Sequence, residues 1–245
     1  MVNCKKRLSL LASGAVLLLA AVVAASGVVA ALTDSERKKG FDFSSIDRVA
    51  FLAMTRVESD NDKMTSCPVR RGRHPACDIA DHAESELSRL VAHALYGSSI
   101  EVEWIEQSRM NEARAKLKKE GRPELTRYGS WQRAIGKELQ ADAVLFGFIY
   151  CYRERKGTAY ASAEPAALSF CLHLVDPESG EILWTFTYED EQKALFENLL
   201  NLPEFIERGC KWIPVEQMAR EAARKVVEKT PFPRQEKTAQ ESGGR

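Results

Sequence analysis

The stretch "WQRAIGKELQADAVLFGFIYCY", residues 131–152, decides the fold, because it joins two periodicities without a break. In residues 131–140 apolar side chains recur at helical spacing. Residues 143–150 are an uninterrupted apolar run, the pattern of a strand covered on both faces. We therefore predict an amphipathic helix that leads directly into a central strand.

Towards the N-terminus the same alternation of strand and helix continues. Residues 46–54 predict a first strand, and Asp78 is a candidate N-cap for a helix that starts at Ile79. A second strand is expected at 100–105, followed by a charged helix at 108–121. This order is typical of an α/β layer with right-handed crossovers.

Towards the C-terminus the pattern changes to a hairpin. Residues 167–175 and 181–191 alternate in polarity, and "DPESG" at 176–180 suits a tight turn. The hairpin occurs once, which excludes a propeller, and Trp184 is expected to pack in the core. The predicted fold is a three-layer-like mixed α/β sheet with helices packed on it and an antiparallel C-terminal hairpin.

Two more helices are predicted at 193–209 and 214–230, the second with an apolar stripe suited to the sheet. We expect one domain over 46–230, preceded by a spacer at 33–45 and followed by a disordered tail at 231–245.

The N-terminus has the layout of an export signal. Basic residues at 5–7 precede an uncharged run from Leu8 to Leu32. Such a run is cleaved as a signal peptide or retained as a membrane anchor, and both readings stay open for 1–32. The rest of the chain is expected outside the cytoplasm, either periplasmic or anchored through residues 8–32 to the inner membrane.

Charge argues against nucleic acid as a partner. The chain has 35 basic and 35 acidic residues, without a basic stripe interleaved with aromatic residues. No nucleophile elbow, zinc-protease or phosphate-loop motif is present, so we expect no enzyme activity and no cofactor.

Five cysteines follow the apolar run, in a compartment where disulfides persist. Cys67 and Cys77 could close a loop rich in proline and arginine. Cys151 and Cys171 could pair if their strands are antiparallel neighbours, which geometry must decide. Cys210 would then be left over.

The same loop permits a metal site as the alternative. Cys67, His74, Cys77 and His82 offer two sulfurs and two imidazoles, the donors of tetrahedral zinc, although their spacing fits zinc motifs poorly. This set would belong to a small exported metal-dependent hydrolase. Otherwise His74 lies in a solvated loop and His82 on the outer face of a helix.

Residues 57–78 form a long polar segment between the first strand and the first helix. Such segments are uncommon in compact domains unless they are functional, so we expect a contact surface here.

Taken together, residues 46–229 resemble the bacterial envelope proteins grouped with the curli-secretion protein CsgG and the peptidoglycan-synthase activator LpoB. The positions that carry the resemblance lie in the helix-to-strand junction and in the hairpin: Gly136, Ala141, Asp142, Gly147, Asp176, Gly180 and Trp184. The resemblance implies a non-catalytic accessory protein of the envelope that acts by contact with another envelope protein.

The chain departs from that pattern in two ways. No lipid-attachment cysteine follows the apolar run, because Cys4 precedes it. The long strand pairs of a secretion channel are also missing from the predicted elements, so a channel is not expected.

The orientation can be tested with a reporter enzyme fused after Glu36. The basic flank should keep the N-terminus in the cytoplasm, and the reporter should be active only outside it. Activity confined to the cytoplasm would contradict export.

Overall fold

The structure is a computed structural model, and it describes residues 32–59, 63–96, 100–119, 130–157, 162–192 and 213–232. The predicted leader up to residue 31, the helix at 193–209 with Cys210, and residues 233–245 of the predicted tail lie outside these ranges. Within the described residues, no helix has the length and apolar character needed to cross a membrane.

One mixed sheet organises the chain, with strand order β1-β11-β10-β7-β2-β6 and β3 paired to β7. Its strands are β1 (Leu32–Arg37), β2 (Arg48–Leu52), β3 (Thr55–Arg56), β6 (Glu101–Ile105), β7 (Ala143–Arg153), β10 (Ala167–Val175) and β11 (Ile182–Glu191). The pairing is parallel between β6 and β2, between β2 and β7, and between β3 and β7. It is antiparallel between β7 and β10, between β10 and β11, and between β11 and β1. The predicted fold class is confirmed.

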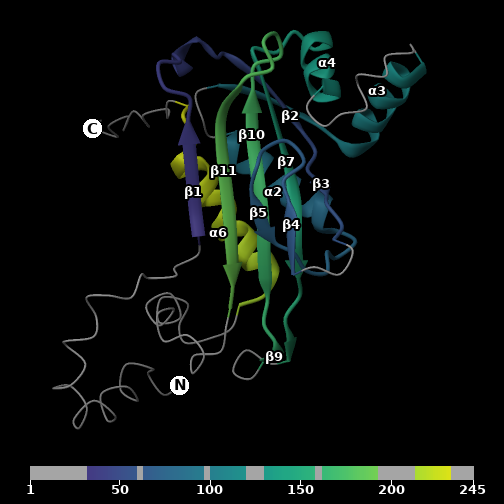
Figure 1. Ribbon diagram of the computed structural model, residues 1–245, viewed down its shortest axis with the longest axis vertical. Coiled ribbons are helices and arrows are strands. Elements are labelled where there is room, and N and C mark those ends of the chain that lie inside the picture. Colours follow the sequence, from purple (N-terminus) through teal and green to yellow (C-terminus); the bar gives the residue numbers. More distant parts are fainter. Residues whose placement is uncertain are drawn as a thin grey trace, which may run out of the picture.

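Two helices cover one face of the sheet. These are α2 (Ala83–Leu95) and α6 (Val215–Lys229), which lie behind the strands in Figure 1. The buried stripe of α6, from Val215 to Val226, packs in the same apolar cluster as Leu87 and Val91 of α2 and Phe170 of β10. The predicted stripe is therefore core.

The opposite face of the sheet is covered partly by two helices and partly by a short hairpin. Helices α3 (Gln107–Lys119) and α4 (Ser130–Glu138) lie over one end of it, and Trp131 and Ile135 of α4 pack against Phe146 and Phe148. The middle is covered by a short hairpin of β4 (Met64–Ser66) and β5 (Arg73–Pro75), in front of β10 and β7 in Figure 1. This hairpin lies within the polar segment 57–78, where the sequence predicted no strands.

Strand β7 is the centre of the structure. Ten of its eleven residues are buried, as the apolar run predicted. At Gly147 a side chain could not be accommodated, because a Cβ there would lie 2.5 Å from the carbonyl oxygen of Cys171. The close approach of β7 and β10 thus depends on this glycine.

The predicted hairpin is formed by β10 and β11, closed by the turn at 176–180. Gly180 has φ +76°, and its amide donates to the carbonyl of Asp176. In the chain, β7 and β10 are connected by a segment that contains a separate short ribbon of β8 (Lys156–Gly157) and β9 (Ser162–Glu164).

The spacer expected at 33–45 contains an edge strand and a short 3-10 turn, η1 (Phe43–Ser45). Strand β1 pairs with β11 from Leu32 to Arg37, and the Trp184 indole donates to the Ser35 hydroxyl at 3.0 Å. Residues 33–37 of the predicted spacer therefore belong to an edge strand of the sheet.

The first helix also begins later than predicted. Helix α2 starts at Ala83 after His82, and Asp78 does not cap it. Instead, the carbonyl of Asp78 accepts from Tyr152, and the amide of Ala80 donates to Tyr152, because this segment runs beside β7.

Trp184 is 1% exposed and stacks on Phe186 with ring centroids 5.9 Å apart. Replacing it with alanine should lower the free energy of unfolding by about 3–5 kcal/mol, the usual effect of removing a buried large aromatic side chain. Urea unfolding with the disulfide intact measures the change. Tyr96→Ala is the matched control, because Tyr96 is 57% exposed and its loss should change stability by less than about 0.5 kcal/mol.

Candidate functional site

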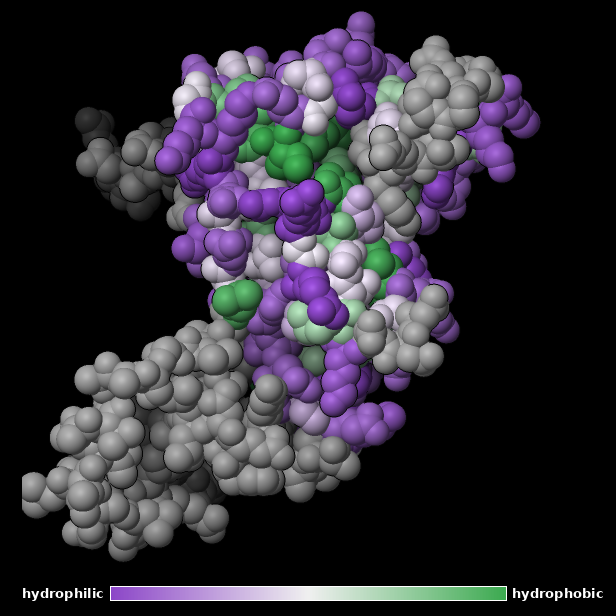
Figure 2. Space-filling view, viewed as in Figure 1, coloured by the Kyte–Doolittle hydropathy of each residue, from purple (hydrophilic) through white to green (hydrophobic). Residues whose placement is uncertain are grey.

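The hairpin of β4 and β5, residues 63–76, presents a basic surface. It contains Lys63, Arg70, Arg71 and Arg73 and has no acidic residue. All four are exposed. Figure 2 shows the face of the molecule that carries the hairpin, where hydrophilic side chains predominate and a limited apolar area lies in the upper part of the view.

One of the arginines fastens the hairpin to the sheet. Arg70 forms an ion pair with Glu36 of β1 and donates to the Thr185 hydroxyl at 3.0 Å. The side chains of Arg71 and Arg73, by contrast, make no ion pair with any described residue. Lys63 makes none either, so three exposed positive charges of the hairpin have no ion-pair partner among the described residues.

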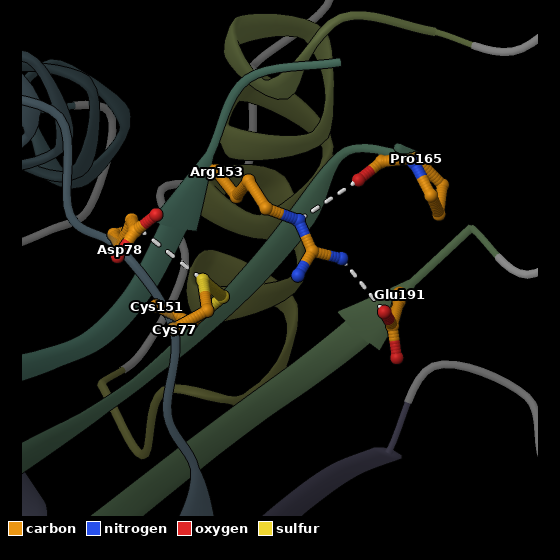
Figure 3. Close-up of a disulfide and its surroundings, with 6 residues drawn as sticks. All are labelled: Cys77, Asp78, Cys151, Arg153, Pro165 and Glu191. Atoms are coloured by element: carbon orange, nitrogen blue, oxygen red, sulfur yellow. Dashed lines mark hydrogen bonds and ion pairs between the residues drawn. A yellow bond between two sulfur atoms is a disulfide. The ribbon is translucent and has the colours of Figure 1, made fainter. Parts of the chain in front are cut away.

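A disulfide fixes the end of this segment. Cys77 is bonded to Cys151 of β7, with the Cα atoms 4.6 Å apart. The amide of Cys77 donates to the carbonyl of Tyr150, which places the two cysteines on neighbouring backbone segments. Figure 3 shows the bond at the end of β7, near Arg153, which donates to Pro165 and pairs with Glu191.

The pairing that the sequence suggested between Cys67 and Cys77 is wrong. The amide of Cys67 bonds to the carbonyl of Gly72 at the closed end of the hairpin. Cys77 lies five residues beyond Gly72, a separation of roughly 16 Å along an extended strand. A disulfide cannot span this distance.

The suggested pairing of Cys151 with Cys171 is wrong as well. Their strands are antiparallel neighbours, as that pairing required, but the register places Cys151 opposite Ser169 and Cys171 opposite Phe148. Cys67 and Cys171 are both free and buried.

The two free cysteines lie together with histidines beneath the hairpin. The Nε2 atom of His173 is 3.1 Å from the Cys171 sulfur and 3.3 Å from the Cys67 sulfur. One donor atom from each of these three residues lies within 4.8 Å of the other two. Tyr150 also contacts the Cys171 sulfur through its hydroxyl, at 3.0 Å.

His74 completes this group from the hairpin side. It is 8% exposed, so it does not lie in a solvated loop. Its Nδ1 atom is 2.9 Å from a carboxylate oxygen of Glu189, and its ring stacks on that of Tyr150. We call Cys67, His74, Cys171 and His173 the cysteine–histidine cluster.

The cluster perturbs the ionisation of its members. A hydrogen bond from Cys171, aided by His173 and His74, lowers the pKa of Cys67 far below its ordinary value despite burial. Burial and the neighbouring Cys67 raise the pKa of Cys171. Burial alone would lower the pKa of His74, but Cys67 and Glu189 outweigh it and raise this pKa to about 9.

The zinc set suggested by the sequence is not assembled as a whole. Cys67 and His74 lie in the cluster, but the Cys77 sulfur is in the disulfide. His82 is exposed, at the start of α2, and lies 3.7 Å from Glu154. His82 is thus exposed as expected, but it precedes the helix as its N-cap residue and does not lie on the outer face of the helix.

Sequence reasoning missed Cys171 and His173 as partners of the loop residues. Their spacing on a strand places both side chains on one face of the sheet, and that signal was available in "FCLHL". The hairpin that brings Cys67 and His74 onto this face had no comparable signal. His173 was expected to be structural, and it is buried within the cluster, although its Nδ1 atom has no partner there.

No family model matches this chain, and no curated protein sequence matches it. Several solved structures are similar to it, and three of them are described below. The first is a PelC dodecamer from Paraburkholderia phytofirmans, 12% identical with TM-score 0.45, which covers 81% of this chain and 96% of the other.

The second similar structure is lipoprotein GNA1162 from Neisseria meningitidis, 12% identical with TM-score 0.36, covering 67% of this chain and 96% of the other. The third is the LpoB C-terminal domain from Escherichia coli, 15% identical with TM-score 0.35, covering 63% and 90%. A bacterial lipoprotein and an LpoB domain are thus among the similar structures. The CsgG part of the resemblance stays a prediction, and we base the function on this chain's own residues.

The disulfide can be tested by peptide mapping without reduction. It should find Cys77 joined to Cys151. Because the bond closes a span of 74 residues, replacing both cysteines with serine should lower the free energy of unfolding by about 2–5 kcal/mol. A peptide that joins Cys67 to Cys77 would contradict the structure.

Proposed function

We propose that the chain is an exported, non-catalytic accessory protein of the bacterial cell envelope, which binds an acidic segment of another envelope protein through the hairpin of β4 and β5. The observation that carries this proposal is the hairpin itself. It places the charges of Arg71 and Arg73, which pair with no described residue, on a segment that Arg70 and the Cys77–Cys151 disulfide hold against the sheet.

A fixed hairpin suits binding better than a mobile loop does. A partner that binds a preordered surface loses less conformational entropy on association. Arginine also recognises carboxylates by paired hydrogen bonds, so acidic side chains are the natural complement of Arg71 and Arg73.

Export is supported by the leader-like N-terminus and by the disulfide. Disulfides are rare in the reducing cytoplasm and persist in the periplasm. Because β1 begins at Leu32, a retained leader would hold the sheet directly at the membrane, and cleavage after Ala30 or Ala31 would leave β1 at the new N-terminus.

The burial of the cysteine–histidine cluster argues against catalysis there. Cys67 is 8% exposed, and Cys171 and His173 are 1% and 2% exposed. A substrate could not reach these sulfurs while the hairpin lies over them. A separate groove of about 250 Å³ between α3 and α4 is lined by Arg109, Glu112, Lys116, Glu138 and apolar residues, without a cysteine, serine or histidine.

The proposal can be tested by photocrosslinking in intact cells. A photoreactive residue in place of Arg71 should give one specific adduct with another envelope protein, and the added change Arg73→Glu should abolish it. The matched control places the same photoreactive residue at Arg224, which is exposed on α6 on the opposite face.

An equal adduct from position 224, or an adduct from position 71 that Arg73→Glu leaves unchanged, would overturn the proposed surface. Circular dichroism should show the same fold for all variants, because the substituted residues are exposed.

A further inference from the structure

The cysteine–histidine cluster brings together donors from two separate parts of the chain. Cys67 and His74 belong to the hairpin, whereas Cys171 and His173 alternate along β10. Two sulfurs and two imidazoles are the ligand set of closed tetrahedral zinc sites. We propose that these four residues bind one Zn²⁺ ion, which joins the hairpin to the sheet.

The distances already approach those that such a site needs. With Zn–S bonds of about 2.3 Å and Zn–N bonds of about 2.0 Å, a tetrahedral site has N···S edges of about 3.5 Å and an S···S edge of about 3.8 Å. The Nε2 atom of His173 lies 3.1 and 3.3 Å from the two sulfurs. The two nitrogen–sulfur distances are thus within a few tenths of an ångström of those in a tetrahedral site, and the two sulfurs lie within 4.8 Å of each other.

His74 is oriented as a zinc ligand commonly is. Its Nδ1 atom is held by the Glu189 carboxylate at 2.9 Å, which leaves Nε2 as the nitrogen available to a metal. Histidine ligands usually have such a carboxylate or carbonyl on their other nitrogen, and this partner fixes the ring and increases its basicity. His74 stands at the edge of the group, because the donor atoms within 4.8 Å of one another are those of Cys67, Cys171 and His173.

A divalent cation would also neutralise the negative charge of two thiolates in the cluster. Two thiolates, two neutral imidazoles and Zn²⁺ have no net charge, which suits residues that are at most 8% exposed.

The competing arrangement is a second disulfide, between Cys67 and Cys171. It would require the two sulfurs to approach to about 2.05 Å. That bond would use neither histidine and would give no role to the carboxylate on His74. The zinc site accounts for all four side chains and for Glu189.

The first test is the metal content of the full-length chain, purified after export without chelators. Mass spectrometry should find about one zinc per chain, retained through dialysis. Replacement by Co²⁺ should give the intense near-ultraviolet absorption of a cobalt–thiolate bond. Copper instead of zinc, absence of metal, or a peptide joining Cys67 to Cys171 would overturn the proposal.

Variants assign the ligands. Cys171→Ser and His173→Gln should each lose the zinc. The matched control is Cys77→Ser with Cys151→Ser, which removes two cysteines and leaves the cluster intact, so its zinc content should stay near one. His82→Gln should also leave zinc unchanged, and loss of zinc in either control would contradict the assignment.

Glu189→Gln tests the positioning role of the carboxylate. It should weaken zinc affinity by about 10- to 100-fold in competition with a chromophoric chelator, as changes to such partners do. The stoichiometry at saturating zinc should remain one. An unchanged affinity would show that His74 is not a ligand. Because the zinc content is measured without a binding partner, the result does not depend on the proposed binding function.

Discussion

The burial of β7 on both faces is the constraint on which the other features depend. A strand with ten buried residues in eleven requires a layer on each side of the sheet. Helices α2 and α6 supply one layer with ordinary apolar stripes. On the other side α3 and α4 cover only one end, so the polar hairpin of β4 and β5 covers the rest. A polar segment used in this way must bury some of its own polar groups, and His74 is the clearest case.

The same constraint explains why the hairpin is attached to the sheet by several specific bonds. A segment with few apolar side chains gains little free energy from the burial of apolar surface. Its attachment to the sheet therefore depends more on covalent and ionic bonds. Arg70 binds the edge strand, the disulfide binds β7, and the proposed zinc ion would bind β10. Because these bonds attach the hairpin to the sheet, its outer side can remain hydrophilic, with Arg71 and Arg73 exposed there. The same arrangement thus explains both the buried cluster and the exposed charges.

The elements that the sequence predicted well are those with strong local patterns, such as β7, the turn at Gly180 and the stripe of α6. The elements that it missed depend on distant partners. Strand β1 is charged and gains its structure from pairing with β11, and the hairpin owes its place to Glu36 and Cys151. Disulfide pairing failed for the same reason, because the register of β7 and β10, which the sequence does not reveal, places Cys171 opposite Phe148 and not opposite Cys151. Proximity in the chain suggested Cys67 with Cys77, whereas the fold brought Cys67 to β10.

Hydrogen exchange of the intact protein is the most direct test that the hairpin is a fixed part of the fold. The amides of Cys67, Ala76 and Cys77 donate to the carbonyls of Gly72, Lys63 and Tyr150. They should therefore be protected for much longer than an unstructured loop, and Cys77 should approach the protection of β7. If these amides exchange as fast as a free peptide while β7 stays protected, the hairpin is not docked, and the account of its surface and its buried cluster is wrong.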